Sequence, residues 1–240
     1  MNIALIFAGG SGQRMNADSL PKQFLVINGK PILIHTLEKF DKHPEIDSIV
    51  ISCKEDWIDR LQKMVRQFSI NKISSIVPGG KTGQESIRNG LLKASSLFSG
   101  DSIVLIHDGV RPLIDSKTIS ANIESVKKYG SAVTVTPAME TIGVIDDDQK
   151  IREIIKRQQV MLCRAPQSFY LHDVVDVHLK AIENGINDVT DTATLMKNYG
   201  WQLNMIEGPM DNIKITTQRD FYALKSLFDL HEYCQLLRKN

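Results

Sequence analysis

The chain has 240 residues, which suits one α/β domain, or one domain with an appendage. It is 42% hydrophobic and 24% charged, and its formal net charge of +1 gives the whole molecule no strong attraction to nucleic acid or to a membrane surface. Any binding of anions must therefore come from the local placement of cationic side chains.

The three cysteines, Cys53, Cys163 and Cys234, are far apart, and no pair has the spacing of a zinc site. Unpaired thiols of this kind are typical of a reducing compartment. The apolar N-terminal run is too short for a signal peptide or a membrane-spanning helix, and no other window is long enough to span a bilayer. We therefore expect a cytoplasmic protein.

Strand and helix patterns alternate along the first part of the chain. Short apolar runs predict buried strands over residues 3–8, 47–53, 72–77, 101–109 and 131–138. Apolar residues at helical spacing predict helices over residues 31–40, 55–68, 84–97 and 115–130, the last closed by Gly130 as a C-cap. This order predicts an α/β fold with a Rossmann-like, mostly parallel sheet and helices on both faces.

The alternation stops near Met139. Residues 139–166 contain short alternating pieces, and residues 146–149 have the composition of a hairpin turn. We predict that this segment is a β-arm projecting from a single domain that comprises residues 1–240. Helix and strand patterns resume with a helix over 172–185, a strand over 201–208 and a last helix over 218–233.

The stretch IFAGGSGQRM, residues 6–15, ends the first predicted strand in three closely spaced glycines. It is not a dinucleotide fingerprint, because Met15 stands where the third glycine is needed. Nor do residues 79–82, GGKT, complete a P-loop, because Ser75 replaces the first glycine of that motif. What remains is a glycine loop whose bare backbone amides can line a polyphosphate.

Two cations follow these glycines. Arg14 carries a charge that cannot be neutralised, and Pro21 stiffens the chain immediately before Lys22. Together with the glycines they indicate a phosphate-binding loop. The competing interpretation is a tight strand-to-helix turn with two solvated cations.

Two later motifs each combine an aspartate with a cation. In HDGVRP, residues 107–112, Asp108 ends a predicted parallel strand, where ligands bind in such sheets, and it is an oxygen donor suited to magnesium. Its alternative role is to cap the following helix. In DNIKIT, residues 211–216, strand alternation would turn Asn212 and Lys214 to one face. Taken alone, that segment is typical of an ordinary surface strand.

The motifs AGGSGQRM, LPKQFL, GKPIL, GGKTGQESIRNGL, HDGVRP, APQSF, DVTDTATLM and DNIKIT follow one another from residue 6 to residue 216. In this order they resemble the signature of the nucleotidyltransferases that activate sugars and polyols. They are similar in particular to the cytidylyltransferases acting on methylerythritol 4-phosphate and ribitol 5-phosphate. The resemblance implies a nucleotide-diphospho-sugar transferase fold, CTP as substrate, Mg2+ as cofactor and a homodimer held by the arm.

The resemblance also implies roles for individual residues. The implied catalytic residues are Arg14, Lys22 and Lys214. The implied CTP contacts are Ala8, Gly9, Gly10, Gly12, Gly80, Ser86 and Asp108. The implied polyol phosphate contacts are Arg111, Thr141, Arg157 and Thr190, with Arg157 reaching the site of the partner subunit. The implied metal ligands are Asp108 and Asp211.

The chain departs from its relatives at two positions. It has Gly83 where they usually have arginine, with Lys81 nearby as a substitute charge, and Ala165 where they typically have threonine. The segments RAPQSFY, PAMETI and NIKITT resemble those of the polyol activators of capsule and teichoic acid assembly. This resemblance favours ribitol 5-phosphate as acceptor over methylerythritol 4-phosphate.

The reaction that we expect is attack of the polyol phosphate on the α-phosphorus of CTP, with release of pyrophosphate. A phosphate monoester has a second pKa of about 6, so its oxygen is already anionic near neutrality and needs no general base. Preorganised cations would instead offset the repulsion between two polyanions. The alternative from another class is a nucleotide-binding dimer without turnover, because a fold alone does not establish catalysis.

Overall fold

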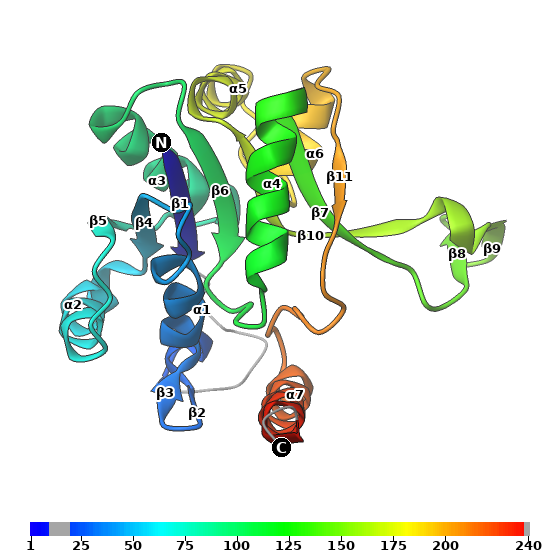
Figure 1. Ribbon diagram of the computed structural model, residues 1–240. Coiled ribbons are helices and arrows are strands. Elements are labelled where there is room, and N and C mark those ends of the chain that lie inside the picture. The colour runs from blue at the N-terminus through cyan, green and yellow to red at the C-terminus, as the bar shows by residue number, and fades with distance from the viewer. Residues whose placement is uncertain (10–19, 238–240) are drawn as a thin grey trace.

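The computed structural model describes residues 1–9 and 20–237, so the predicted site residues Gly10, Gly12 and Arg14 lie outside the described part of the chain. Its centre is a seven-stranded sheet with the strand order β11-β7-β10-β6-β1-β4-β5 (Figure 1). The strands are β1 (Asn2–Ala8), β4 (Ser48–Cys53), β5 (Ile73–Pro78), β6 (Ile103–Asp108), β7 (Ser131–Pro137), β10 (Met161–Tyr170) and β11 (Met205–Glu207).

Only one of these seven strands runs against the others. The β1 strand pairs in parallel with β4 and β6, β4 with β5, and β11 with β7. The β10 strand lies between β6 and β7 and is antiparallel to both. The predicted α/β fold with a mostly parallel sheet is therefore confirmed.

Helices cover both faces of the sheet, because the buried strands are apolar on both sides. One face carries α1 (Ile32–Asp41), α2 (Ile58–Gln67) and α4 (Ser116–Tyr129). The other carries α3 (Gly83–Leu97), α5 (Leu171–Glu183) and α6 (Thr192–Asn198). Within β1, Ala4 and Ile6 pack into the first core, and Ile3 and Leu5 pack into the second.

Side-chain caps fix where several helices begin. Asp115 accepts a hydrogen bond from the Thr118 backbone N–H at 2.7 Å and caps α4. The helix-capping role considered for Asp108 is thus filled by a different aspartate. The α4 helix ends at Gly130, whose φ of 79° confirms the predicted glycine C-cap.

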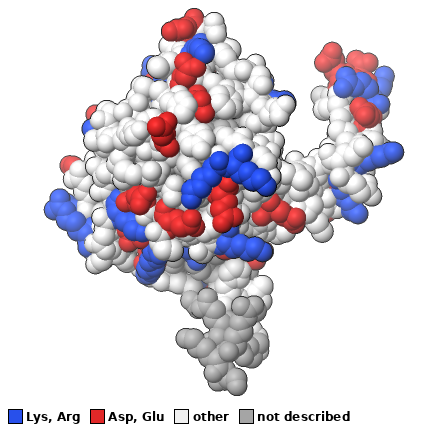
Figure 2. Space-filling view, turned by 45° about the horizontal axis from the view of Figure 1, so that its top comes forward, with Lys and Arg blue, Asp and Glu red and all other residues white. Residues whose placement is uncertain are grey.

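A β-hairpin projects from the edge of the domain (Figure 1). Its strands are β8 (Ile142–Ile145) and β9 (Ile151–Ile155), followed by the short 3-10 helix η4 (Arg157–Gln159). Pairing of β10 with β7 begins at Met161, so residues 161–166 of the expected arm belong to the central sheet. Figure 2 shows side chains of both charge signs on the arm and mixed over the visible face of the main body.

The C-terminal helix α7 (Gln218–Leu237) packs against the short strand β2 (Val26–Ile27) and the start of α1, and β2 pairs with β3 (Lys30–Pro31). Two further 3-10 helices are η2 (Lys22–Phe24) and η3 (Glu55–Trp57). Residues 211–216, the DNIKIT segment, begin in a turn at Asp211 and form no strand. Within the described residues, no helix combines the length and the apolar character needed to cross a bilayer.

Candidate active site

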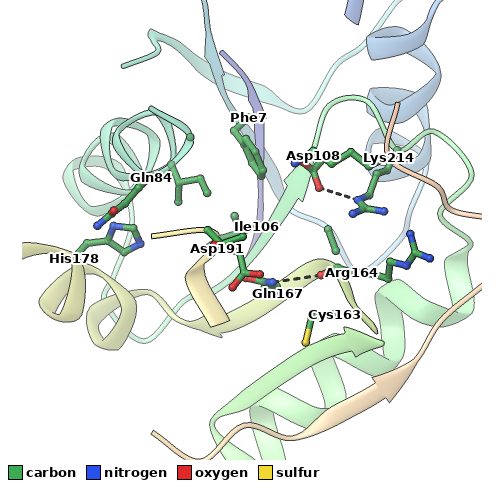
Figure 3. Close-up of a pocket in the computed structure, with 15 residues that line it drawn as sticks. Phe7, Gln84, Ile106, Asp108, Cys163, Arg164, Gln167, His178, Asp191 and Lys214 are labelled. Atoms are coloured by element: carbon green, nitrogen blue, oxygen red, sulfur yellow. Dashed lines mark hydrogen bonds and ion pairs between the residues drawn. The ribbon is translucent and has the colours of Figure 1, made fainter. Parts of the chain in front are cut away.

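Two adjoining cavities open beside the carboxyl ends of β1 and β6. The first, of about 460 Å³, is lined by four lysines, and we call it the lysine cavity. The second, of about 300 Å³, is lined by Arg111 and Arg164, and we call it the arginine cavity (Figure 3). Both are lined by Phe7, Gly83, Asp108 and Lys214. A molecule in one cavity can therefore meet a molecule in the other at these four residues.

Three predicted CTP contacts meet in the wall of the lysine cavity. The Gly80 backbone N–H donates to Ser86 Oγ at 3.0 Å, and this hydroxyl donates to the Thr82 carbonyl at 2.9 Å. A Cβ at Gly9 would lie only 2.5 Å from Ser86 Oγ, so the position requires glycine. The backbone at Gly9, just after β1, is thereby packed against the Ser86 hydroxyl in the first turn of α3.

The PKQF motif is fixed to the end of β1 by a residue that the sequence did not single out. Gln23 is buried, and its Nε2 donates to the Ala8 carbonyl at 2.7 Å. This bond places Lys22, the first residue of η2, in the wall of the lysine cavity. The other three lysines of that cavity are Lys54, Lys81 and Lys214.

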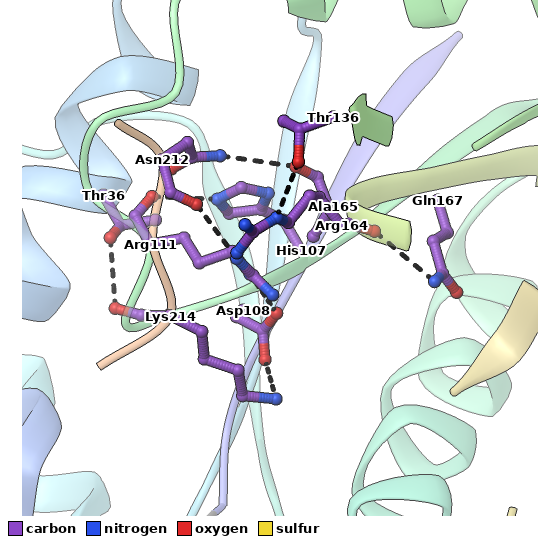
Figure 4. Close-up of polar contacts among 11 residues, drawn as sticks. Thr36, His107, Asp108, Arg111, Thr136, Arg164, Ala165, Gln167, Asn212 and Lys214 are labelled. Carbon is purple, nitrogen blue, oxygen red and sulfur yellow. Dashed lines mark hydrogen bonds and ion pairs between the residues drawn. The ribbon is translucent and has the colours of Figure 1, made fainter. Parts of the chain in front are cut away.

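Asp108 lies between two cations at the junction of the cavities (Figure 4). Arg111 Nε is 2.8 Å from Asp108 Oδ2, and Lys214 Nζ is 2.6 Å from Asp108 Oδ1. Burial alone would raise the pKa of Asp108, but the charges of Lys214 and Arg111 hold that pKa well below its usual range. The carboxylate is therefore ionised at neutral pH and fixes the direction of both cations.

The HDGVRP and DNIKIT segments are joined by several hydrogen bonds. Arg111 donates to the Asn212 carbonyl at 2.9 Å, and the Ile215 backbone N–H donates to the Val110 carbonyl at 3.2 Å. Burial lowers the pKa of His107 to about 4, and its neutral ring donates from Nε2 to the Arg111 carbonyl at 3.0 Å. Lys214 is thus held beside Asp108, although the two residues are 106 positions apart in the sequence.

The arginine cavity contains one predicted acceptor contact besides Arg111, namely Thr190. Gln84 holds the loop that carries Thr190, because its side chain donates to the Ile186 carbonyl at 3.0 Å and accepts from the Val189 N–H at 2.8 Å. Several further lining residues were not predicted from the sequence. They are Cys163, Arg164, Gln167, His178 and Asp191.

Other predicted site residues lie elsewhere in the chain. Asp211 lines neither cavity, and its Oδ2 lies 3.0 Å from His231 Nε2. Thr141 and Arg157 are exposed on the arm, and Arg157 donates to the Met139 carbonyl at 3.0 Å. The arm that carries both residues projects sideways from the domain (Figure 1), and neither residue is among those that line the two cavities of the same chain.

The two aspartates expected to bind magnesium lie in different surroundings. Asp108 is ionised at the cavity junction, whereas Asp211 faces His231, and the described residues contain no group of three potential metal ligands. Proteins commonly hold Mg2+ through only one or two carboxylates together with substrate phosphates. Asp108 fits that pattern as a single protein carboxylate beside the cavity that four lysines line.

Residues 2–228 match the family described as 2-C-methyl-D-erythritol 4-phosphate cytidylyltransferase (IspD). The chain belongs to this family. It is 49% identical to the ribitol-5-phosphate cytidylyltransferase of Streptococcus agalactiae serotype V over 98% of both chains. It is 36% identical to the 2-C-methyl-D-erythritol 4-phosphate cytidylyltransferase of Clostridium novyi over 97% of this chain and 99% of that one.

A solved structure of the family has the same fold. The 4-diphosphocytidyl-2C-methyl-D-erythritol synthase of Anaerococcus prevotii superposes with a TM-score of 0.83 at 27% identity, covering 95% of this chain and 96% of that one. The family assignment from the sequence motifs is thereby confirmed. The order of strands in this fold brings segments as distant as residues 9, 86, 108 and 214 to one end of the sheet.

Proposed function

We propose that this protein transfers the cytidylyl group of CTP to a polyol phosphate, most readily ribitol 5-phosphate, and releases pyrophosphate. The observation that carries the proposal is the pair of adjoining cavities that share Asp108 and Lys214. The lysine cavity suits a triphosphate, because it has four lysines and one aspartate in its lining. The arginine cavity suits a smaller phosphorylated acceptor.

The chain's own residues act by positioning and by neutralising charge. In the proposed complex Gly9, Gly80 and Ser86 contact the nucleotide, and Lys22 and Lys214 face its phosphates. Arg14, which lies outside the described residues, has the same expected role. Because the attacking phosphate oxygen is already anionic, the protein needs fixed cations along the path of attack rather than a base.

Asp108 is the residue that would hold Mg2+, together with phosphate oxygens of the substrate. The ion would supply further positive charge where negative charge gathers on the phosphates. Asp211 is the second proposed ligand; for this role its carboxylate would have to turn from His231 toward the cavity.

The acceptor is proposed from the relatives. The four matches at 47–49% identity are all named ribitol-5-phosphate cytidylyltransferase, whereas matches named for methylerythritol 4-phosphate are 36–38% identical. Methylerythritol 4-phosphate is the alternative acceptor. A cytoplasmic location, expected from the cysteine pattern, is part of the same proposal.

A homodimer is also proposed, with the arm as its contact. Apolar side chains are exposed along the arm, including Met139, Ile145, Ile151 and Ile154, each more than 60% accessible. Such a concentration on a projecting hairpin is typical of a surface that another chain covers. In the dimer Thr141 and Arg157 would reach the acceptor site of the partner subunit.

The test is release of pyrophosphate from CTP and Mg2+ with each of the two polyol phosphates in turn, with the product identified by mass spectrometry. We expect kcat/KM for ribitol 5-phosphate to exceed that for methylerythritol 4-phosphate by at least tenfold. The reverse order would assign the alternative acceptor. Binding of CTP without turnover of either compound would favour the non-catalytic nucleotide-binding dimer.

A further inference from the structure

Arg164 lines the arginine cavity, but the proposed function assigns it no role. Its guanidinium is half-buried and donates from Nε to Thr136 Oγ1 at 3.2 Å. Among the described residues, no carboxylate lies within ion-pair distance of it. Arg111 and Lys214, by contrast, share the carboxylate of Asp108.

A local irregularity of β10 directs Arg164 toward the site. The pairing of β10 with β7 shifts register between Cys163 and Gln167, and pairing with β6 begins only at Gln167, opposite Ile106. Bulges of this kind bend a strand and re-aim side chains beside functional sites. Arg164 therefore lies where β10 separates from the carboxyl end of β6, and it lines the arginine cavity together with Asp108 and Arg111 (Figures 3 and 4).

The surroundings of Arg164 are unfavourable for a cation on its own. Burial lowers the pKa of this guanidinium, and the nearby charge of Arg111 lowers that pKa further. A half-buried guanidinium beside a second guanidinium is stabilised when an anion enters the cavity and lies close to both. Asp191, the other carboxylate in the lining, instead accepts a hydrogen bond from the Thr194 N–H at 2.8 Å as the cap of α6.

We propose that Arg164 binds the phosphate monoester of the acceptor and makes the arginine cavity selective for phosphorylated polyols. A guanidinium presents several N–H donors in one plane, which matches the oxygens of a phosphate. With Nε held by Thr136, the two terminal nitrogens are the groups that can meet the ligand. This inference rests on the proposed function, because it assigns a role in binding the acceptor of that reaction.

The first test compares Arg164→Gln, which removes the charge, with Arg164→Lys, which keeps it. A hydrogen-bonded charge typically accounts for about tenfold or more in affinity. We expect Arg164→Gln to raise KM for the acceptor by about tenfold or more and to leave KM for CTP within about twofold. Arg164→Lys should recover part of the loss. Arg66→Gln, an exposed arginine on α2, is the matched control and should change neither constant.

The second test does not need turnover. Inorganic phosphate is titrated calorimetrically into the CTP-saturated protein, and we expect its Kd to be about tenfold weaker in Arg164→Gln than in the wild type. The inference is overturned if Arg164→Gln leaves the acceptor KM and the phosphate Kd within twofold of wild type. It is also overturned if Arg164→Lys behaves like Arg164→Gln, or if KM for CTP rises as much as that for the acceptor. Failure of the wild type to turn over either polyol phosphate would overturn the proposed function instead, and the phosphate titration would still test Arg164.

Discussion

Lys22 forms part of the wall of the lysine cavity, and the buried Gln23 beside it is bonded to the end of β1. A cation that is fixed before the reaction stabilises charge developing on the phosphates without any cost of reorganisation. Lys22→Ala should therefore reduce kcat by about a hundredfold or more, with only a modest change in KM for CTP. Steady-state kinetics of pyrophosphate release measure both constants.

The control for this variant is Lys197→Ala, an exposed lysine on α6 that lines neither cavity. It should retain wild-type kinetics. A Lys22→Ala variant with normal kcat would show that Lys22 does not stabilise the transition state.

A second prediction at this scale concerns His178, which is buried beside the arginine cavity. Burial lowers its pKa to about 4 in the folded protein, against about 6.5 when it is unfolded. The unfolded chain thus binds a proton more readily between these values, and the free energy of unfolding falls as pH falls from 6.5 toward 4. At pH 5 this histidine alone should cost about 2 kcal/mol relative to pH 7.

Urea unfolding of the wild type and of His178→Leu at pH 7 and pH 5 measures this contribution. The stability lost between the two pH values should be smaller in the variant by about 2 kcal/mol. The variant keeps His107, another buried histidine whose pKa burial lowers to about 4, so some dependence on pH should persist. Identical losses in the two proteins would show that His178 does not stay neutral in the folded state.

At the scale of single elements, helix α3 offers a matched pair of glycines. A Cβ added at Gly83 meets nothing within 4 Å, whereas one added at Gly90 would collide with Leu5 Cδ1 in the core. Gly83→Ala should raise the free energy of unfolding by about 0.5 kcal/mol, because alanine restricts the unfolded chain. Gly90→Ala should lower it by about 1–3 kcal/mol, because the core there is already filled. Urea denaturation of both variants compares them directly.

The open space at Gly83 also bears on its departure from the relatives. Because the residue lines both cavities and a Cβ there would meet nothing within 4 Å, the arginine that the resemblance implies for this position would have room at the shared opening. Lys81, two residues earlier, lines the lysine cavity and supplies a charge there. If Gly83→Ala instead lowered the free energy of unfolding, residue 83 would require glycine despite the open space around it.

The elements were predictable where local sequence decides them. Apolar runs identified β1, β4 and β6, because strands buried on both faces need no polar alternation. Shorter apolar pieces identified β5 and β7, although serines or threonines interrupt them. Gly9 follows β1 directly, and Gly80 and Lys81 follow β5 closely, so the motifs that contain them could be recognised. Residues 161–170 were harder, because their place between β6 and β7 depends on distant pairing partners.

Arg164 and His178 escaped prediction for the same reason. The RAPQ segment was noted as a family motif, but only the register shift in β10 directs its arginine into the cavity. His178 is one residue of an amphipathic helix, and nothing in the local pattern distinguishes a cavity wall from an ordinary core position. The placement of Asp211 beside His231 likewise depends on how α7 packs, which its sequence does not reveal.

At the scale of the whole molecule, the arm determines the assembly that we propose. Replacing Ile151 and Ile154 with glutamate puts charge on its exposed apolar surface. This double variant should be monomeric by light scattering at concentrations where the wild type is dimeric, while its melting temperature changes little because the arm projects from the core. The control is Gln149→Glu in the exposed hairpin turn, which adds charge to the arm without removing apolar surface.

The dimer further predicts which subunit supplies Arg157. If its guanidinium serves the partner's site, a dimer of one Lys22→Ala subunit and one Arg157→Gln subunit contains one site with both defects and one site with neither. Mixing the two inactive proteins and allowing subunits to exchange should therefore restore about a quarter of wild-type activity, since about half of the dimers are mixed and each has one intact site. If Arg157 instead served its own chain, every site in the mixed dimer would lack one of the two cations. Mixing would then restore nothing, although light scattering would still show dimers.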